Sequence, residues 1–143
     1  MTAILQQVDS GKPFNVLIIL QENGQIIFNT LNEMAKVWNN NFSGYAYTIS
    51  APPVMGNGDW DNYLYRIKYF NWCEQQVNKV VMGFNLVGMR QDNELGEKVP
   101  LLSTWSPQTL NLYDQRIQNN IKSIQNEINL LQHMFEIYEL REG

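Results

Sequence analysis

The sequence is poor in the two residue types that most often act as catalytic base and nucleophile near neutral pH, histidine and cysteine. It contains one histidine, His133, and one cysteine, Cys73. A Ser–His–Asp set would have to use His133, but the sequence has no G-x-S-x-G motif. Cys73 lies in a dense apolar stretch with no basic group to activate it, so we expect a buried, inert thiol. We predict no catalytic residue and no enzymatic activity. A single cysteine also excludes an intramolecular disulfide and a cysteine metal cluster.

One acidic loop comes close to a metal-binding pattern. Asn57, Asp59 and Asp61 are spaced like the first three ligands of an EF-hand loop. The resemblance then fails, because the sixth position is Asn62, where glycine is required, and the twelfth is Lys68, where a bidentate glutamate is required. We expect these loop carboxylates to cap the next element. No metal and no cofactor are predicted.

The same loop is a candidate for contact with another protein. It contains Pro52-Pro53 and Gly56-Asn57-Gly58, so it is both stiff and sharply turned. The glycines lack the lysine of a phosphate-binding P-loop. An aromatic residue between two acids on a rigid loop suits recognition of a partner. The predicted partner-binding loop therefore consists of Asp59, Trp60 and Asp61.

The remaining polar groups do not point to a substrate. Asp92, Glu94 and Glu97 lie on a polar connector and are expected to be solvated. The aromatic residues between positions 60 and 72 could stack on bases or sugars. No cluster of basic residues accompanies them, however, because the ten Lys and Arg residues are scattered along the sequence and the net charge is −4. We predict no nucleic-acid partner and no membrane partner, and packing as the role of these aromatics.

The composition is poor in charge and rich in amides. Charged residues make up 17% of the 143 residues, against a usual share of about 25%, and the chain holds 18 Asn and 12 Gln. The length suits one domain with a sizeable core. Met1 to Ser10 has no basic n-region and no apolar h-region of signal length, and the longest apolar run, Val16 to Leu20, is too short to span a bilayer. We expect a cytoplasmic protein where it is made.

The N-terminal part has the pattern of a mixed α+β domain, residues 1–100. Phe14 to Leu20 and Gln25 to Phe28 read as two strands joined by an Asn23-Gly24 hairpin turn. A capping box at Thr30 and Glu33 then starts a short helix with one apolar face. The members of that face are Leu31, Met34, Ala35 and Trp38, and the helix ends at Asn39 to Asn41. Tyr45, Tyr47 and Ile49 alternate in a third strand, Gly44 to Ser50.

The segment from residue 62 to residue 89 fits two patterns. Its aromatics alternate as in a strand, whereas Tyr63, Ile67, Phe70, Val77, Val81 and Phe84 also have helical spacing. The aromatic content and Gly83 and Gly88 favour strands near 63–72 and 79–89. The predicted fold class is therefore α+β, a small and mostly antiparallel sheet with one short helix and a long C-terminal amphipathic helix.

The last quarter of the chain, residues 106–141, is predicted to form that long helix. Ser106-Pro107 is a helix start signal. A heptad stripe follows, composed of Ile117, Ile121, Ile124, Ile128, Leu131, Phe135 and Tyr138. In this register His133 falls at the outermost position. The stripe can pack on the chain's own core or on another copy, in the same domain or as a projecting element. In the heptad abcdefg, Ile121 and Ile128 occupy position a and Ile124 occupies position d. Isoleucine at both positions favours trimers or tetramers over dimers, so we predict that the stripe is an oligomer interface.

These observations favour a non-enzymatic structural or assembly protein that forms homo-oligomers. Its partners would be proteins, and copies of itself first. A charge-poor, amide-rich chain with a long helix suits a virion or phage tail component. The alternative is a small acidic inhibitor or immunity-type protein that binds and blocks an enzyme or a toxin.

Overall fold

The computed structural model describes residues 3–7, 16–42, 44–54, 63–86 and 115–140. They form three helices, α1 (Val16–Asn41), α2 (Tyr63–Leu86) and α3 (Gln115–Ile137). Two further stretches lie outside the helices, and we call residues 3–7 the first extended segment and residues 44–54, which begin with a bend at 44–45, the second extended segment. The described residues contain no strand. The predicted α+β fold with an antiparallel sheet is therefore wrong, and the described fold is all-helical.

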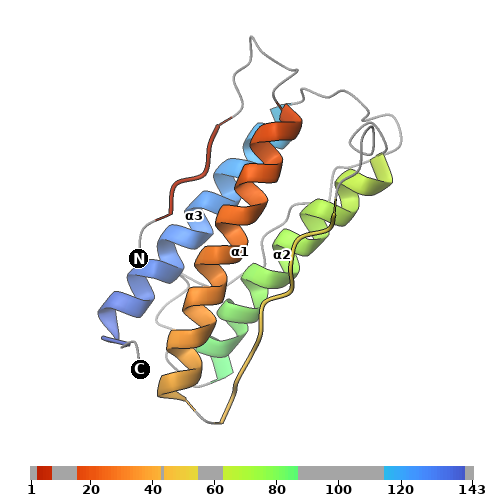
Figure 1. The fold of residues 1–143 in the computed structure, drawn as a ribbon. Coiled ribbons are helices and arrows are strands. Elements are labelled where there is room, and N and C mark those ends of the chain that lie inside the picture. Colours follow the sequence, from red (N-terminus) through yellow and green to blue (C-terminus); the bar gives the residue numbers. More distant parts are fainter. Residues whose placement is uncertain (1–2, 8–15, 43, 55–62, 87–114, 141–143) are drawn as a thin grey trace.

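The three helices run in the same direction (Figure 1). Near the starts of α1 and α2, the Tyr69 hydroxyl donates to the Leu20 carbonyl oxygen at 2.7 Å. Near their ends, the ring centroids of Trp38 and Phe84 are 5.0 Å apart, and Phe84 lies 5.3 Å from Phe135 of α3. In an up-and-down bundle the start of one helix would instead meet the end of the next. The bundle is parallel, so the chain must return to the same end between helices.

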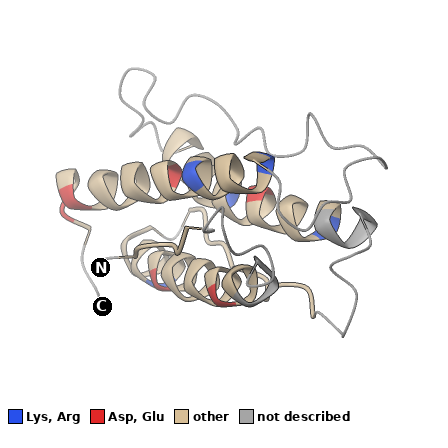
Figure 2. Ribbon diagram, turned by 90° about the horizontal axis from the view of Figure 1, so that it is seen from above, with Lys and Arg blue, Asp and Glu red and all other residues tan. Residues whose placement is uncertain are grey.

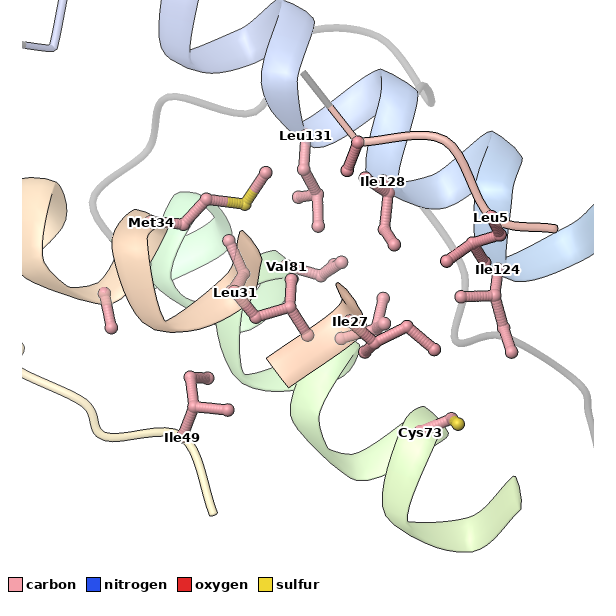
Figure 3. Packing of buried hydrophobic residues seen from close by; sticks show 14 of the residues in the cluster. Leu5, Ile27, Leu31, Met34, Ile49, Cys73, Val81, Ile124, Ile128 and Leu131 are labelled. Atoms are coloured by element: carbon pink, nitrogen blue, oxygen red, sulfur yellow. The ribbon is translucent and has the colours of Figure 1, made fainter. Parts of the chain in front are cut away.

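The core lies between the three helices. Figure 3 shows the side chains of Ile27, Leu31, Val81, Ile128 and Leu131 converging from α1, α2 and α3. Trp38, Phe70 and Phe84 are the largest fully buried side chains. Charged residues are few and dispersed over the helices (Figure 2). The stability of the bundle therefore rests on apolar burial, at about 1.5–3 kcal/mol for each large side chain.

The hairpin predicted at Asn23-Gly24 is wrong, because α1 continues through both residues without a break. Gly24 lies where α1 packs against Tyr69 of α2. A Cβ atom built on it would lie 3.3 Å from Cε2 of Tyr69, which is tighter than most real contacts. Asn23 is almost completely buried and hydrogen-bonds the first extended segment. A dipeptide typical of turns therefore serves as a helix-packing and hydrogen-bonding site.

The helix predicted to start at Thr30 is part of this longer α1, so its predicted start is wrong. Its predicted apolar face is confirmed, since all four members are buried: Leu31, Met34, Ala35 and Trp38. Its predicted end is also confirmed, because α1 ends at Asn41. A capping box indicates a helix start only where the residues before it are not helical themselves.

The predicted third strand is extended but has no strand partner among the described residues. Its predicted alternation is correct, since Tyr47 and Ile49 are buried while Ala46 and Thr48 are exposed. Its backbone is hydrogen-bonded by side chains of α1 and α2 instead of a neighbouring strand. The alternating pattern identified a half-buried extended segment, which need not belong to a sheet.

The two strands predicted within residues 63–89 are wrong, because residues 63–86 form the single helix α2. The alternative helical spacing was the correct one, and Phe70, Val77, Val81 and Phe84 from that set are buried. Gly83 is a packing site, because a Cβ atom there would lie 3.2 Å from Cζ2 of Trp38. Aromatics that favour strands in general here fill the space between parallel helices.

The predicted C-terminal helix is confirmed over residues 115–137, and residues 106–114 lie outside the described part of the chain. It ends four residues before Arg141, the predicted end. The Leu140 amide donates to the Phe135 carbonyl and the Glu139 amide to the Glu136 carbonyl, and Glu139 has a left-handed φ of 51°. This is a Schellman motif, which satisfies the last carbonyls of the helix. The described part of α3 lies along α1 and α2 rather than projecting (Figure 1).

Candidate functional site

Both extended segments are attached to the helices by side-chain amides. Asn39 of α1 illustrates this attachment, because its side-chain amide binds both the backbone N–H and the backbone carbonyl of one residue, Tyr47. The Tyr47 amide donates to Asn39 Oδ1 at 3.1 Å, and Asn39 Nδ2 donates to the Tyr47 carbonyl at 3.0 Å. We call such a two-point bond from a side-chain amide to an extended backbone an amide clamp.

A second amide clamp holds the first extended segment against α1. The Gln6 amide donates to Asn23 Oδ1 at 2.8 Å, and Asn23 Nδ2 donates to the Gln6 carbonyl at 2.9 Å. Asn23 is 1% exposed, so its amide would be costly to bury without these two bonds. The position of the segment and the burial of Asn23 therefore depend on each other.

A third amide clamp holds the other edge of the first extended segment against α3. The Leu5 amide donates to Gln125 Oε1 at 2.5 Å, and Gln125 Nε2 donates to the Ala3 carbonyl at 2.9 Å. Gln125 Nε2 also lies 2.9 Å from Asn129 Oδ1, which orients it from the next turn of the helix. The segment is thus held on both backbone edges, by α1 on one side and by α3 on the other.

Along α2, three side chains each make one hydrogen bond to the backbone of the second extended segment. The Ser50 amide donates to Gln76 Oε1 at 2.9 Å, and Trp72 Nε1 donates to the Ser50 carbonyl at 2.8 Å. Lys79 Nζ donates to the Thr48 carbonyl at 2.9 Å. The bonds fall on successively earlier helix residues as the segment advances, so the segment runs antiparallel to α2.

The apolar side chains of the segments insert between these bonds. In the first extended segment Ala3 and Leu5 are buried, whereas Ile4 is 76% exposed. Leu5 points into the core beside Ile124 (Figure 3). This combination binds an extended polypeptide, since the amides bind its backbone and the core accepts alternate side chains. Chemically, the described surface is suited to binding peptide.

A shallow depression also lies on the outer face of α2, open to solvent, with a volume of about 500 Å³. Its lining combines polar and apolar surface and comprises Tyr45, Asn71, Glu74, Gln75, Asn78, Lys79 and Met82. Asn78 Oδ1 is buried without a hydrogen-bond partner. The depression lies beside the second extended segment, to which Tyr45 belongs.

The heptad stripe faces the core of its own chain. All of its members within α3 are at most 4% exposed: Ile117, Ile121, Ile124, Ile128, Leu131 and Phe135. Tyr138 follows the helix and is partly buried against the same core. The heptad spacing alone left open whether the stripe packs on its own chain or on another copy. In the structure these side chains pack on α1 and α2 of their own chain. A second copy could reach them only if the bundle opened, and association of copies stays a prediction.

The other candidate residues do not gather at one place. Cys73 is fully buried and free, and burial raises the pKa of its thiol, which disfavours the reactive thiolate. His133 is exposed on α3, as predicted. The predicted partner-binding loop, Asp59, Trp60 and Asp61, lies outside the described residues, as do the candidate carboxylates at 92, 94 and 97. Within the described ranges, no group of three or more His, Cys, Asp or Glu could hold a metal ion.

The amide clamps were missed in the sequence, where the Asn and Gln residues read only as a neutral surface. A signal was nevertheless present. Asn23 lies next to a glycine in a helical apolar pattern and is buried, whereas Asn39 is exposed and gave no such signal. An amide at such a position needs a partner when it is buried. The partners of Gln125 could not be identified, because Leu5 and Ala3 lie 120 and 122 residues away in the sequence. Tyr47 lies only 8 residues from Asn39, but its segment was expected to pair with a neighbouring strand.

No protein-family model matches the chain, and no curated protein or solved structure is significantly similar to it. None of the described helices combines the length and the apolar character needed to cross a membrane.

Proposed function

We propose that this protein is a non-enzymatic assembly protein that binds other proteins, and first of all copies of itself. The observation that carries the proposal is the repeated amide clamp at Asn23, Asn39 and Gln125. Each uses one donor and one acceptor to bind an extended backbone, which is the main-chain chemistry of peptide recognition. The bundle thus already binds two extended segments of its own chain.

The composition supports an assembly role of a particular kind. A charge-poor, amide-rich surface provides many neutral hydrogen-bonding groups, and it opposes the approach of identical chains little despite the net charge of −4. Virion and phage tail components must pack identical chains closely, so this setting remains our first suggestion. The heptad stripe is buried in the core of its own chain, and we propose that copies associate through the surface around the extended segments instead.

One observation favours the second candidate, a small inhibitor or immunity-type protein that blocks an enzyme or a toxin. The core of the described bundle is complete within one chain, with every member of the stripe in α3 buried. Such a chain can fold and act as a monomer. Its acidic charge would then be directed at a basic partner.

The oligomeric state in solution separates the two candidates. We expect light scattering after size exclusion to give a mass above the 16.7 kDa of one chain, increasing as the loaded concentration rises from about 1 μM to 1 mM. A mass of one chain at every concentration would contradict the self-associating form and favour the inhibitor.

A further inference from the structure

We propose that copies of this protein associate by exchanging the first extended segment, so that residues 3–7 of one copy bind between Asn23 and Gln125 of another. This inference rests on the proposed function, for which it supplies the mode of self-association. We call the place between these two side chains the seat.

The seat binds the segment mainly through its backbone. Its four clamp bonds go to main-chain groups of Ala3, Leu5 and Gln6. Any copy of the segment offers the same groups in the same order. Transfer to another molecule therefore replaces each bond with an identical one, which makes exchange of an identical element a low-cost route to association.

Side-chain contacts favour the chain's own sequence over an unrelated peptide. Gln6 Nε2 donates to a carboxylate oxygen of Glu22, and Gln118 Nε2 donates to Gln7 Oε1 at 2.7 Å. Leu5 fills the core and is only 3% exposed. The segment itself is uncharged, so it adds no repulsion between two acidic copies. These features select a second copy as the occupant.

The connection to α1 sets the conditions for exchange. Residues 8–15 separate the segment from α1 in the sequence, and eight residues reach at most about 29 Å. Binding within one chain then has an effective concentration in the millimolar range. Exchange competes with this closure, so it should dominate where the local protein concentration is comparably high, as in an assembly.

Two complementary variants test the proposal. Leu5→Asp removes the occupant but leaves the seat, whereas Asn23→Leu damages the seat but leaves the occupant. We expect each full-length variant to be monomeric by light scattering and their equimolar mixture to form a 1:1 dimer. Ile4→Asp is the matched control for Leu5→Asp, because Ile4 is the exposed neighbour, and it should associate like the original protein. A mixture that stays monomeric while both variants are folded would overturn the exchange.

A peptide measurement keeps the proposal testable if Asn23→Leu fails to fold. A labelled peptide of residues 1–10 should bind the full-length Leu5→Asp protein at least tenfold more tightly than the original protein, whose seat is filled. The same peptide carrying Ile4→Asp should bind equally well, and one carrying Leu5→Asp at least tenfold more weakly. Equal binding of all three peptides would contradict the proposal that the segment binds at the seat with Leu5 in the core.

The outcomes separate this inference from the function on which it rests. If the original protein forms oligomers that Leu5→Asp leaves unchanged, exchange is wrong and assembly stands. If the original protein is monomeric up to 1 mM and the variants do not complement, both proposals fail.

Discussion

Single amide side chains in this protein take the place of a neighbouring strand. A helix cannot offer its main-chain groups to an extended segment, because they are bonded within the helix. Asn and Gln carry one donor group and one acceptor group on the same carbon, so they can reproduce the pair that a strand would supply. Asn39 does so for Tyr47, and Asn23 does so for Gln6. Part of the high amide content thus has a structural purpose.

Two buried tyrosines provide a matched pair at the residue scale. The Tyr69 hydroxyl donates to the Leu20 carbonyl, whereas the Tyr47 hydroxyl is buried without a partner. We expect Tyr69→Phe to lower the free energy of unfolding by about 1 kcal/mol, and Tyr47→Phe to leave it unchanged or raise it by up to about 1 kcal/mol. Urea denaturation measures both. A loss of stability in Tyr47→Phe equal to that in Tyr69→Phe would contradict the assigned hydrogen bonding.

Glu127 should make stability depend on pH. Burial raises the pKa of its carboxyl group above the ordinary value, and one oxygen is buried without a partner. The folded state therefore binds more protons than the unfolded state between the two pKa values, so stability increases as the pH falls through that window toward about 4.3. We expect the melting temperature of the original protein to rise relative to Glu127→Gln between pH 7 and that value.

The control for this experiment is Glu136→Gln, which removes an exposed carboxylate from the same helix. It corrects for the general effect of losing one negative charge. A melting-temperature difference between the original protein and Glu127→Gln that is the same at pH 7 and near pH 4.3 would show that this carboxyl is not perturbed by burial.

At the scale of elements, the sequence was sufficient where one helix has one apolar face. The apolar face of α1 from Leu31 to Trp38 was predicted correctly, and so was the helix that carries the stripe, over residues 115–137. The predicted role of the stripe as an oligomer interface stays a prediction, because its members within α3 are buried in the core of one chain. Prediction failed where local signals serve tertiary packing, as at Gly24 and Gly83, which admit the rings of Tyr69 and Trp38. It failed for the Gln125 clamp because its two halves are 120 and 122 residues apart in the sequence. It failed for the Asn39 clamp, whose halves are only 8 residues apart, because the segment with Tyr47 was expected to pair with a strand. The predicted partner-binding loop at residues 59–61 lies outside the described residues and stays a prediction.

The role of the stripe can be tested on α3 itself. Ile124 is 1% exposed within one chain, so Ile124→Asp places an unpaired charge in the core and should cost at least about 4 kcal/mol, a large part of the stability of a domain. We expect loss of the helical circular dichroism signal at 25 °C. Asn126→Asp is the control, since Asn126 is exposed on the same helix. A folded Ile124→Asp protein with altered oligomeric state would show that the stripe contacts another copy.

At the scale of the whole molecule, the parallel arrangement aligns the three helix dipoles. None of the helices has an acidic residue in its first turn or a basic residue in its last turn, so side-chain charges there do not offset the aligned dipoles. The apolar core and the amide clamps must therefore offset the unfavourable interaction between the three aligned helix dipoles. The second extended segment contributes to this, because it runs between the ends of the bundle and ties α1 to α2 through Asn39, Trp72 and Gln76.

The same parallel order has a consequence for how fast the chain folds. No two of the three described helices can pair as a hairpin, since residues 42–62 and 87–114 separate them in sequence and each of the three starts at the same end. The first helix pair can therefore form only after a long loop has closed. We expect refolding in about milliseconds to seconds, slower than the microseconds to milliseconds of bundles built from local contacts. Stopped-flow tryptophan fluorescence would follow refolding, because two of the four tryptophans, Trp38 and Trp72, are buried in the folded chain. Refolding that is complete within the dead time would show that local helix formation, rather than loop closure, sets the rate.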